Sequence, residues 1–166
     1  NGQFYPPFAV SPDGGRLFTG RGAGGQGIWV IDCGADTVLG SIALGQRPDL
    51  LVASSRLDKV CALCGSTFII IDLENNQLSR AIPLTHGVRA LGYSPNQEFW
   101  YCFGQRGRDT VTVIDGRRDS VRAVVSAPGV RSGEPLSLAL WNPLTDRLYY
   151  RTSDESCASR TMAVEG

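Results

Sequence analysis

The stretch GIWVIDCGADTVLGSIALGQRP, residues 27–48, decides the architecture of this chain. It reads as a strand that ends in an acid, a tight turn, a second strand, and then glycine and proline. The pattern returns as TFIIIDLENNQLSRAIPLTHG at residues 67–87 and as TVTVIDGRRDSVRAVVSAPG at residues 110–129. The closing acids are Asp32, Asp72 and Asp115, with a weaker echo at Glu165, at spacings of 40, 43 and 50 residues. Repeats of this length are typical of β-propeller blades.

Each repeat reads as four short strands joined by turns, with few helix signals. The fourth repeat stops before its outermost strand, so the sequence predicts 15 strands where four complete blades need 16. We therefore predict an all-β propeller array of about four 40-residue, four-stranded blades, the last lacking its outer strand. The approximate blade boundaries are 7–47, 48–87, 88–129 and 130–166, within one partial propeller domain.

An open last blade leaves unpaired backbone donors and acceptors at its edge, which native folds normally cover. Three explanations follow from the sequence: the chain is part of a longer propeller, two copies close a larger ring, or the blade stays open. The first two make a larger or homo-oligomeric propeller. Self-association through the open edge is accordingly one expected partner interaction.

Inner strands of a blade are buried on both faces and should read as apolar runs, as Phe68–Ile71 and Val111–Ile114 do. We expect Phe18, Cys61, Trp100 and Tyr149 to occupy equivalent places on the second strand of each blade. The repeated acids are expected to form turns, by accepting hydrogen bonds from backbone amides two residues on.

Composition limits the function classes. The 16 basic and 16 acidic residues cancel, so no global field favours nucleic acid. No apolar run reaches the length of a membrane span, and no signal peptide is recognisable. The five cysteines are an odd number without regular spacing, which argues against a disulfide framework.

The run Val30-Ile31-Asp32, Thr37-Val38 and Ile42–Pro48 resembles the YVTN family of β-propeller repeats. Ser11–Gly20, SPDGGRLFTG, is similar to that family's segment between its first two strands. The resemblance covers nearly the whole chain and implies a bacterial or archaeal protein that is secreted or at the cell surface. Related propellers include lactonases and quinoprotein-like dehydrogenases. The resemblance supplies no catalytic residue, cofactor or metal ligand for this chain.

Three motifs suggest chemistry, and each also has a structural explanation. Gly20–Gly25 matches G-x-G-x-x-G, but a strand rather than a helix follows, which favours a hairpin loop over dinucleotide binding. Cys61 and Cys64 form a lone C-x-x-C, more typical of buried structural cysteines than of a redox or metal pair. His86, the only histidine, lies in a loop with no nucleophile motif around any serine.

Loop placement gives the one positive functional prediction. In a propeller, the loops between second and third strands and the connections between blades emerge at the same end. The cationic and imidazole side chains expected there are Arg21, Arg47, His86, Arg89, Arg106, Arg108 and Arg131. Arginine forks suit carboxylate or phosphate. We therefore predict a non-catalytic recognition or scaffold module for a protein or a small anionic ligand. The alternatives are a lactonase or quinoprotein-type enzyme and a structural surface-layer module.

Overall fold

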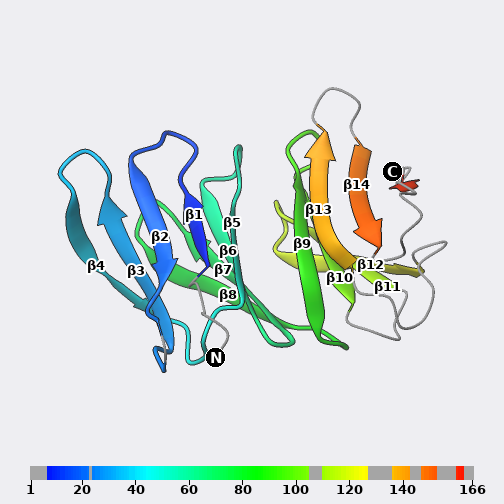
Figure 1. Cartoon of the computed structure of the whole chain (residues 1–166), viewed down its shortest axis with the longest axis horizontal. Coiled ribbons are helices and arrows are strands. Elements are labelled where there is room, and N and C mark those ends of the chain that lie inside the picture. The colour runs from blue at the N-terminus through cyan, green and yellow to red at the C-terminus, as the bar shows by residue number, and fades with distance from the viewer. Residues whose placement is uncertain are drawn as a thin grey trace. The chain divides into compact units, whose positions relative to one another are not determined.

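The computed structural model describes residues 7–22, 24–104, 110–126, 136–142, 147–152 and 160–162. These residues form 15 strands, as the sequence predicts, arranged in antiparallel sheets in which consecutive strands are neighbours (Figure 1). The described part contains no helix of the length and apolarity that crossing a bilayer would require. The chain divides into two compact units, Asn1–Pro83 and Leu84–Gly166.

Two four-stranded sheets make up the first unit. The first contains β1 (Phe8–Val10), β2 (Arg16–Gly20), β3 (Gly27–Asp32) and β4 (Thr37–Ala43). The second contains β5 (Leu50–Ala53), β6 (Lys59–Cys64), β7 (Thr67–Asp72) and β8 (Gln77–Pro83).

Two further sheets belong to the second unit. One contains β9 (Val88–Ser94), β10 (Phe99–Gly104), β11 (Thr110–Asp115) and β12 (Ser120–Ser126). The other has three strands among the described residues: β13 (Leu136–Asn142), β14 (Arg147–Thr152) and β15 (Arg160–Met162). Three four-stranded antiparallel sheets built on one repeat confirm the predicted propeller fold class.

The core of the first unit lies between its two sheets. One face of β1–β4 supplies Phe18, Ile28 and Val30, and the facing side of β5–β8 supplies Val60, Ala62, Ile69 and Ile71. Strand β1 neighbours β5, and β4 neighbours β8, so the sheets stack with like strands adjacent. Burial of these side chains follows the two-residue period of a strand.

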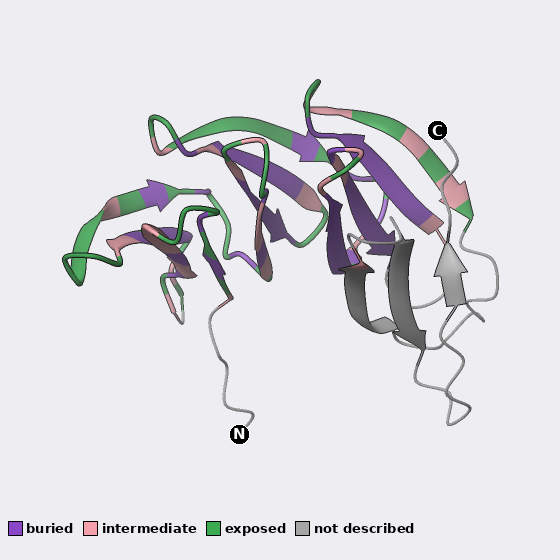
Figure 2. Ribbon diagram, turned by 90° about the horizontal axis from the view of Figure 1, so that it is seen from above, coloured by how far each residue is buried: buried purple, intermediate pink, exposed green. Residues whose placement is uncertain are grey.

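The outermost strands β4, β8 and β12 are largely exposed, while the middle strands of the second and third sheets are largely buried (Figure 2). Each of these outer strands carries one extra residue relative to its partner: Leu39 in β4, Ser79 in β8 and Arg122 in β12. A bulge of this kind increases the local twist of a strand. Its recurrence at equivalent places shows that the repeat extends to irregular backbone geometry.

The repeated acids form turns, as predicted. One carboxylate oxygen of Asp32 accepts hydrogen bonds from the backbone N–H of Gly34 at 2.8 Å and of Ala35 at 2.9 Å. Asp72 and Asp115 accept equivalent pairs from the second and third residues after them. Each turn then closes through a residue with positive φ: Asp36 at 52°, Asn76 at 55° and Asp119 at 51°. Short polar side chains tolerate that conformation best.

The strand register corrects one sequence-based equivalence. Asp32, Asp72 and Asp115 pair with Arg16, Lys59 and Phe99 respectively, so Phe18 and Cys61 correspond to Tyr101. The prediction of Trp100 at this place was wrong by one residue. Trp100 points to the opposite face of the sheet, where its ring lies 4.4 Å from that of its cross-strand partner Tyr93. The register of β14 supports the position predicted for Tyr149.

Replacing the turn acid Asp32 by alanine should destabilise the first unit. The substitution leaves the amides of Gly34 and Ala35 without their acceptor, at a cost of about 0.5–2 kcal/mol. Asp32→Asn keeps an acceptor oxygen in the same place and should lose less than half as much. Urea unfolding of both variants measures the difference, and equal losses would rule out the hydrogen bonds as the cause.

Candidate functional site

The first unit has two loop ends, and the predicted arginine-bearing end is one of them. The loop between β2 and β3 and the connection from β4 to β5 meet there, because the Leu44 N–H donates to the Gln26 carbonyl at 3.0 Å. Arg21 and Arg47 thus belong to neighbouring loops, and both are exposed. The Arg21 guanidinium lies 4.7 Å from the centre of the Trp29 ring, an arrangement that orients its charge.

The glycine-rich loop is a hairpin, as predicted. The strand β3 follows it directly, and Gly22 and Gly24 adopt positive φ values of 77° and 82°. Glycine is the residue that reaches this conformation without strain. No helix amino terminus is present after this loop to receive a pyrophosphate.

The other predicted loop residues all belong to the second unit, and the structure describes two of them, His86 and Arg89. His86 is buried, with its Nδ1 3.1 Å from the Thr85 hydroxyl, whereas Arg89 is exposed. The predictions for Arg106, Arg108 and Arg131 lie outside the described residues. A buried imidazole is poorly placed to meet a substrate, which weakens the case for His86 as a general base.

Cys61 and Cys64 are both buried, and neither is part of a disulfide bond. Burial, followed by the nearby carboxylate of Asp49, raises the pKa of Cys64 to about 11. The thiolate is the form that binds metals and attacks disulfides, so this environment opposes either role. Among the described residues, no group of three histidine, cysteine or acidic side chains could hold a metal ion.

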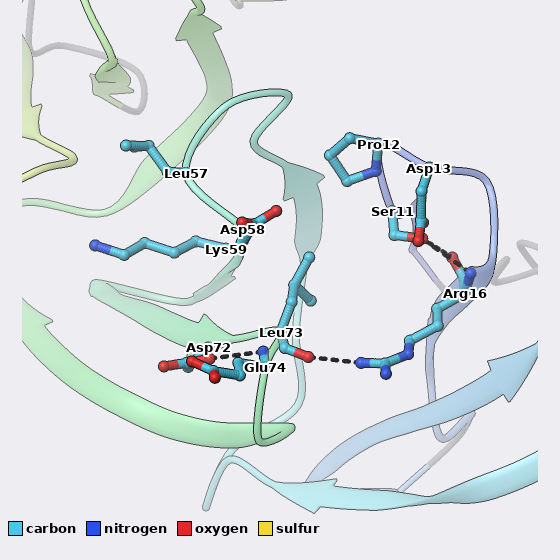
Figure 3. A pocket seen from close by; sticks show the side chains of 10 residues that line it. All are labelled: Ser11, Pro12, Asp13, Arg16, Leu57, Asp58, Lys59, Asp72, Leu73 and Glu74. Atoms are coloured by element: carbon cyan, nitrogen blue, oxygen red, sulfur yellow. Dashed lines mark hydrogen bonds between the residues drawn. The ribbon is translucent and has the colours of Figure 1, made fainter.

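The opposite end of the first unit contains a groove of about 720 Å³. Three loops form it: the β1–β2 loop, the β5–β6 loop and the β7–β8 hairpin (Figure 3). Its lining residues are Ser11, Pro12, Asp13, Arg16, Leu57, Asp58, Lys59, Asp72, Leu73 and Glu74. Concave sites between two packed elements are common places for ligands.

Arg16 connects the two sheets across this groove. One of its terminal nitrogens donates to the Leu73 carbonyl at 2.5 Å (Figure 3). The same nitrogen also donates to the Asn76 side-chain oxygen at 3.0 Å. Both acceptors belong to the turn that follows β7. Arg16 is therefore committed to holding the second sheet's hairpin against the first sheet, and its role in the groove is structural.

The acids of the groove fall into two groups. Asp13 accepts hydrogen bonds from the Ser11 hydroxyl at 2.5 Å and the Gly15 amide at 3.0 Å, and the Ser11 bond foremost lowers the pKa of Asp13. Asp72 accepts a hydrogen bond from the Glu74 amide within its own turn. Asp58 and Glu74 form the second group, and like Asp13 they are exposed. With four acidic and two basic lining residues, the groove favours a cationic group.

A smaller hollow of about 350 Å³ lies at the equivalent end of the β9–β12 sheet. Its charges are largely compensated, because Arg117 pairs with Glu98 and Arg118 lies 3.5 Å from Asp115. Arg122 stacks over the Phe99 ring at 4.7 Å. The hairpin at residues 115–119 is thus an ion-paired turn.

Sequence reasoning did not predict the groove. Nothing in the β1–β2 loop or in the β7–β8 hairpin alone reveals that the other lies beside it. The available signal was the recurrence of Asp13, Asp58 and Asp72 around turns at the same end of successive sheets. A propeller topology places those turns side by side, so the repeat alignment could have located them.

Replacing Arg16 by alanine should weaken the contact between the two sheets of the first unit. Charged hydrogen bonds contribute about 1.5–3 kcal/mol each, so a loss of that order in unfolding free energy is expected. Hydrogen exchange of amides 73–77 should also accelerate. The control is Arg56→Ala in the neighbouring loop, an exposed arginine. Similar losses in both variants would contradict a bridging role for Arg16.

Comparison with known proteins supports the fold alone. No protein family matches the sequence, and no curated protein does. Among solved structures, the chain is similar to Kuenenia stuttgartiensis hydrazine synthase, with a TM-score of 0.76 and 18% sequence identity. The match covers 90% of this chain and 44% of the hydrazine synthase chain, so this sequence spans less than half of that protein's length. At this identity the shared feature is the β-propeller architecture of the sheets.

Proposed function

We propose that this chain is a non-catalytic recognition module of the β-propeller type, which binds a partner through its loop ends. The observation that carries the proposal is the groove of about 720 Å³ formed by loops of two packed sheets. Hydrogen bonds hold three side chains of its lining, those of Arg16, Asp13 and Asp72. The concave shape is therefore organised before a ligand binds. Preorganisation lowers the entropic cost of binding.

The ligand that this groove fits is a cationic side chain or amine. Asp58 and Glu74 present exposed carboxylates, while Arg16 is engaged with the Leu73 carbonyl. A lysine or arginine of a partner protein supplies the matching charge. Leu57 and Leu73 add apolar surface to the lining, which suits the aliphatic stem of such a side chain.

A peptide of alternating glycine and lysine is the direct probe, with the glutamate version of the same peptide as control. The lysine peptide should bind in isothermal titration and weaken as salt rises. The double variant Asp58→Asn with Glu74→Gln should bind it about two- to fivefold more weakly, the range expected for exposed ion pairs.

The matched control is Asp36→Asn, which removes a carboxylate outside the groove lining. Asparagine suits this backbone, because Asn76 occupies the equivalent place with φ 55°. Binding by Asp36→Asn should equal that of the native chain. Equal affinity for lysine and glutamate peptides, or unchanged affinity in the double variant, would rule out the cationic ligand.

A second recognition surface is favoured by one specific observation, the stacking of Arg21 on Trp29 at the other loop end. Together with Arg47 on the adjacent connection, it presents two exposed guanidinium groups at one end of the first unit. We extend the proposal to anion recognition there, for a carboxylate or phosphate of a partner. Arg89 and His86 remain candidates of the second unit for the same class of ligand.

The double variant Arg21→Ala with Arg47→Ala tests this surface. A tetraglutamate peptide and inorganic phosphate are the probes, and the expected loss of affinity is about two- to fivefold. Arg56→Ala with Arg80→Ala removes two exposed arginines elsewhere in the unit and should leave affinity unchanged. If the two double variants behave alike, the effect is one of net charge and the assigned surface is wrong.

A further inference from the structure

The β9–β12 sheet departs from the repeat at one position beside its hollow. In the first two sheets, the acid that ends the third strand pairs with a basic residue of the second strand, Arg16 in one sheet and Lys59 in the other. In the β9–β12 sheet the corresponding acid, Asp115, pairs with Phe99. Phe99 and Asp115 both line the hollow of about 350 Å³. An aromatic ring therefore occupies the place where the first two sheets have a cation.

The outermost strand supplies a cation to this place. Arg122 is the extra residue of β12, at the bulge position that Leu39 and Ser79 occupy in the other two sheets. A bulge can re-aim a side chain. The Arg122 guanidinium lies 4.7 Å from the centre of the Phe99 ring, although β10 and β12 are separated by β11 in the sheet. Leu39 and Ser79 carry no charge, so neither can make an equivalent contact.

The contact with Phe99 prepares Arg122 to bind an anion. A ring face fixes the position of a guanidinium group without supplying a hydrogen-bond acceptor of the carboxylate kind. Arg122 is exposed, so its N–H donors can reach a ligand. These donors form a planar fork that matches the two oxygens of a carboxylate. Because the side chain is oriented before the ligand binds, less conformational entropy is lost on binding.

Three arginines and two acids determine the charge of the hollow. Its described lining includes Arg117, Arg118, Arg122 and Asp115. Arg117 contacts Glu98 through its Nε, and Arg118 Nη1 lies 3.5 Å from an Asp115 carboxylate oxygen. The side chains of these two acids are only 11% and 10% exposed, whereas those of Arg117 and Arg118 are 72% and 78% exposed. Among these described groups, two carboxylates offset two of the three arginines, so one positive charge remains at the surface.

We propose that this hollow binds a carboxylate group, with the Arg122 fork as its main contact and the exposed parts of Arg117 and Arg118 around it. A singly charged carboxylate matches the one positive charge that remains, whereas a phosphate dianion exceeds it. The site belongs to the second unit, while the groove and the Arg21 loop end belong to the first. It is therefore an additional site, and it is independent of both surfaces proposed above.

An NMR titration of the full chain with the capped peptide acetyl-Gly-Glu-Gly-amide tests the proposal. The amide signals of residues 96–99 and 115–122 should shift and saturate. Arg122→Ala should weaken this binding about two- to fivefold, the range for exposed ion pairs. Arg122→Lys should weaken it as well, because an ammonium group keeps the charge and loses the fork. The matched control is Arg80→Ala, at an exposed arginine of the equivalent outer strand β8, and it should bind like the native chain.

Three further probes identify the ligand class. Acetyl-Gly-Gln-Gly-amide has no charge and should not shift these signals. Acetyl-triglycine with a free carboxyl end presents a chain terminus, and the tighter of the two carboxylate peptides identifies the source of the group. Inorganic phosphate should bind more weakly than either. Equal binding of the glutamine peptide, tighter binding of phosphate, native affinity in Arg122→Ala or Arg122→Lys, or an equal loss in Arg80→Ala would each overturn the proposal.

Discussion

Stacking of one sheet on the next is the constraint on which the first unit depends. Phe18, Ile28 and Val30 of one sheet meet Val60 and Ile69 of the next, and all five are nearly inaccessible to solvent. Fully burying side chains of this size contributes about 1.5–3 kcal/mol each. Neither sheet buries these side chains alone, because the apolar face of each is covered by the other sheet.

The turns after the third strands fix the backbone of the loops at one end of the sheets. Each repeated acid fixes the hairpin after the third strand, and the residue following it donates to the carbonyl just before the second strand. The donors are Cys33, Leu73 and Gly116. Because the same bonds recur in three sheets, the end that carries these hairpins has a defined backbone in each. Arg16 can then reach a neighbouring hairpin with a single side chain, and a groove forms between loops that are far apart in sequence.

The sequence was sufficient for the repeat, the strands and the turn chemistry, because each depends on residues close together in the chain. The sequence-based assignment of side chains to one face of a sheet failed where both faces of a strand are apolar. Trp100 and Tyr101 are equally buried, so only the pairing of Phe99 with Asp115 shows which of them corresponds to Phe18. It also could not show that His86 is buried while Arg89 is exposed, since both lie in one short segment of similar polarity.

The turn chemistry also explains why a chain with a net charge of zero has an acidic groove. Acids that end a third strand and residues that adopt positive φ lie at the same end of each of the three four-stranded sheets, so turns built from Asp58 and Asp72 concentrate carboxylates there. In the second unit the arginines at 117 and 118 neutralise the equivalent end through Glu98 and Asp115. The first unit has no such pair of arginines in its β7–β8 hairpin, whose sequence is Leu73-Glu74-Asn75-Asn76. The turn chemistry shared by the three four-stranded sheets thus leaves the first unit with a groove lined by four acidic and two basic residues.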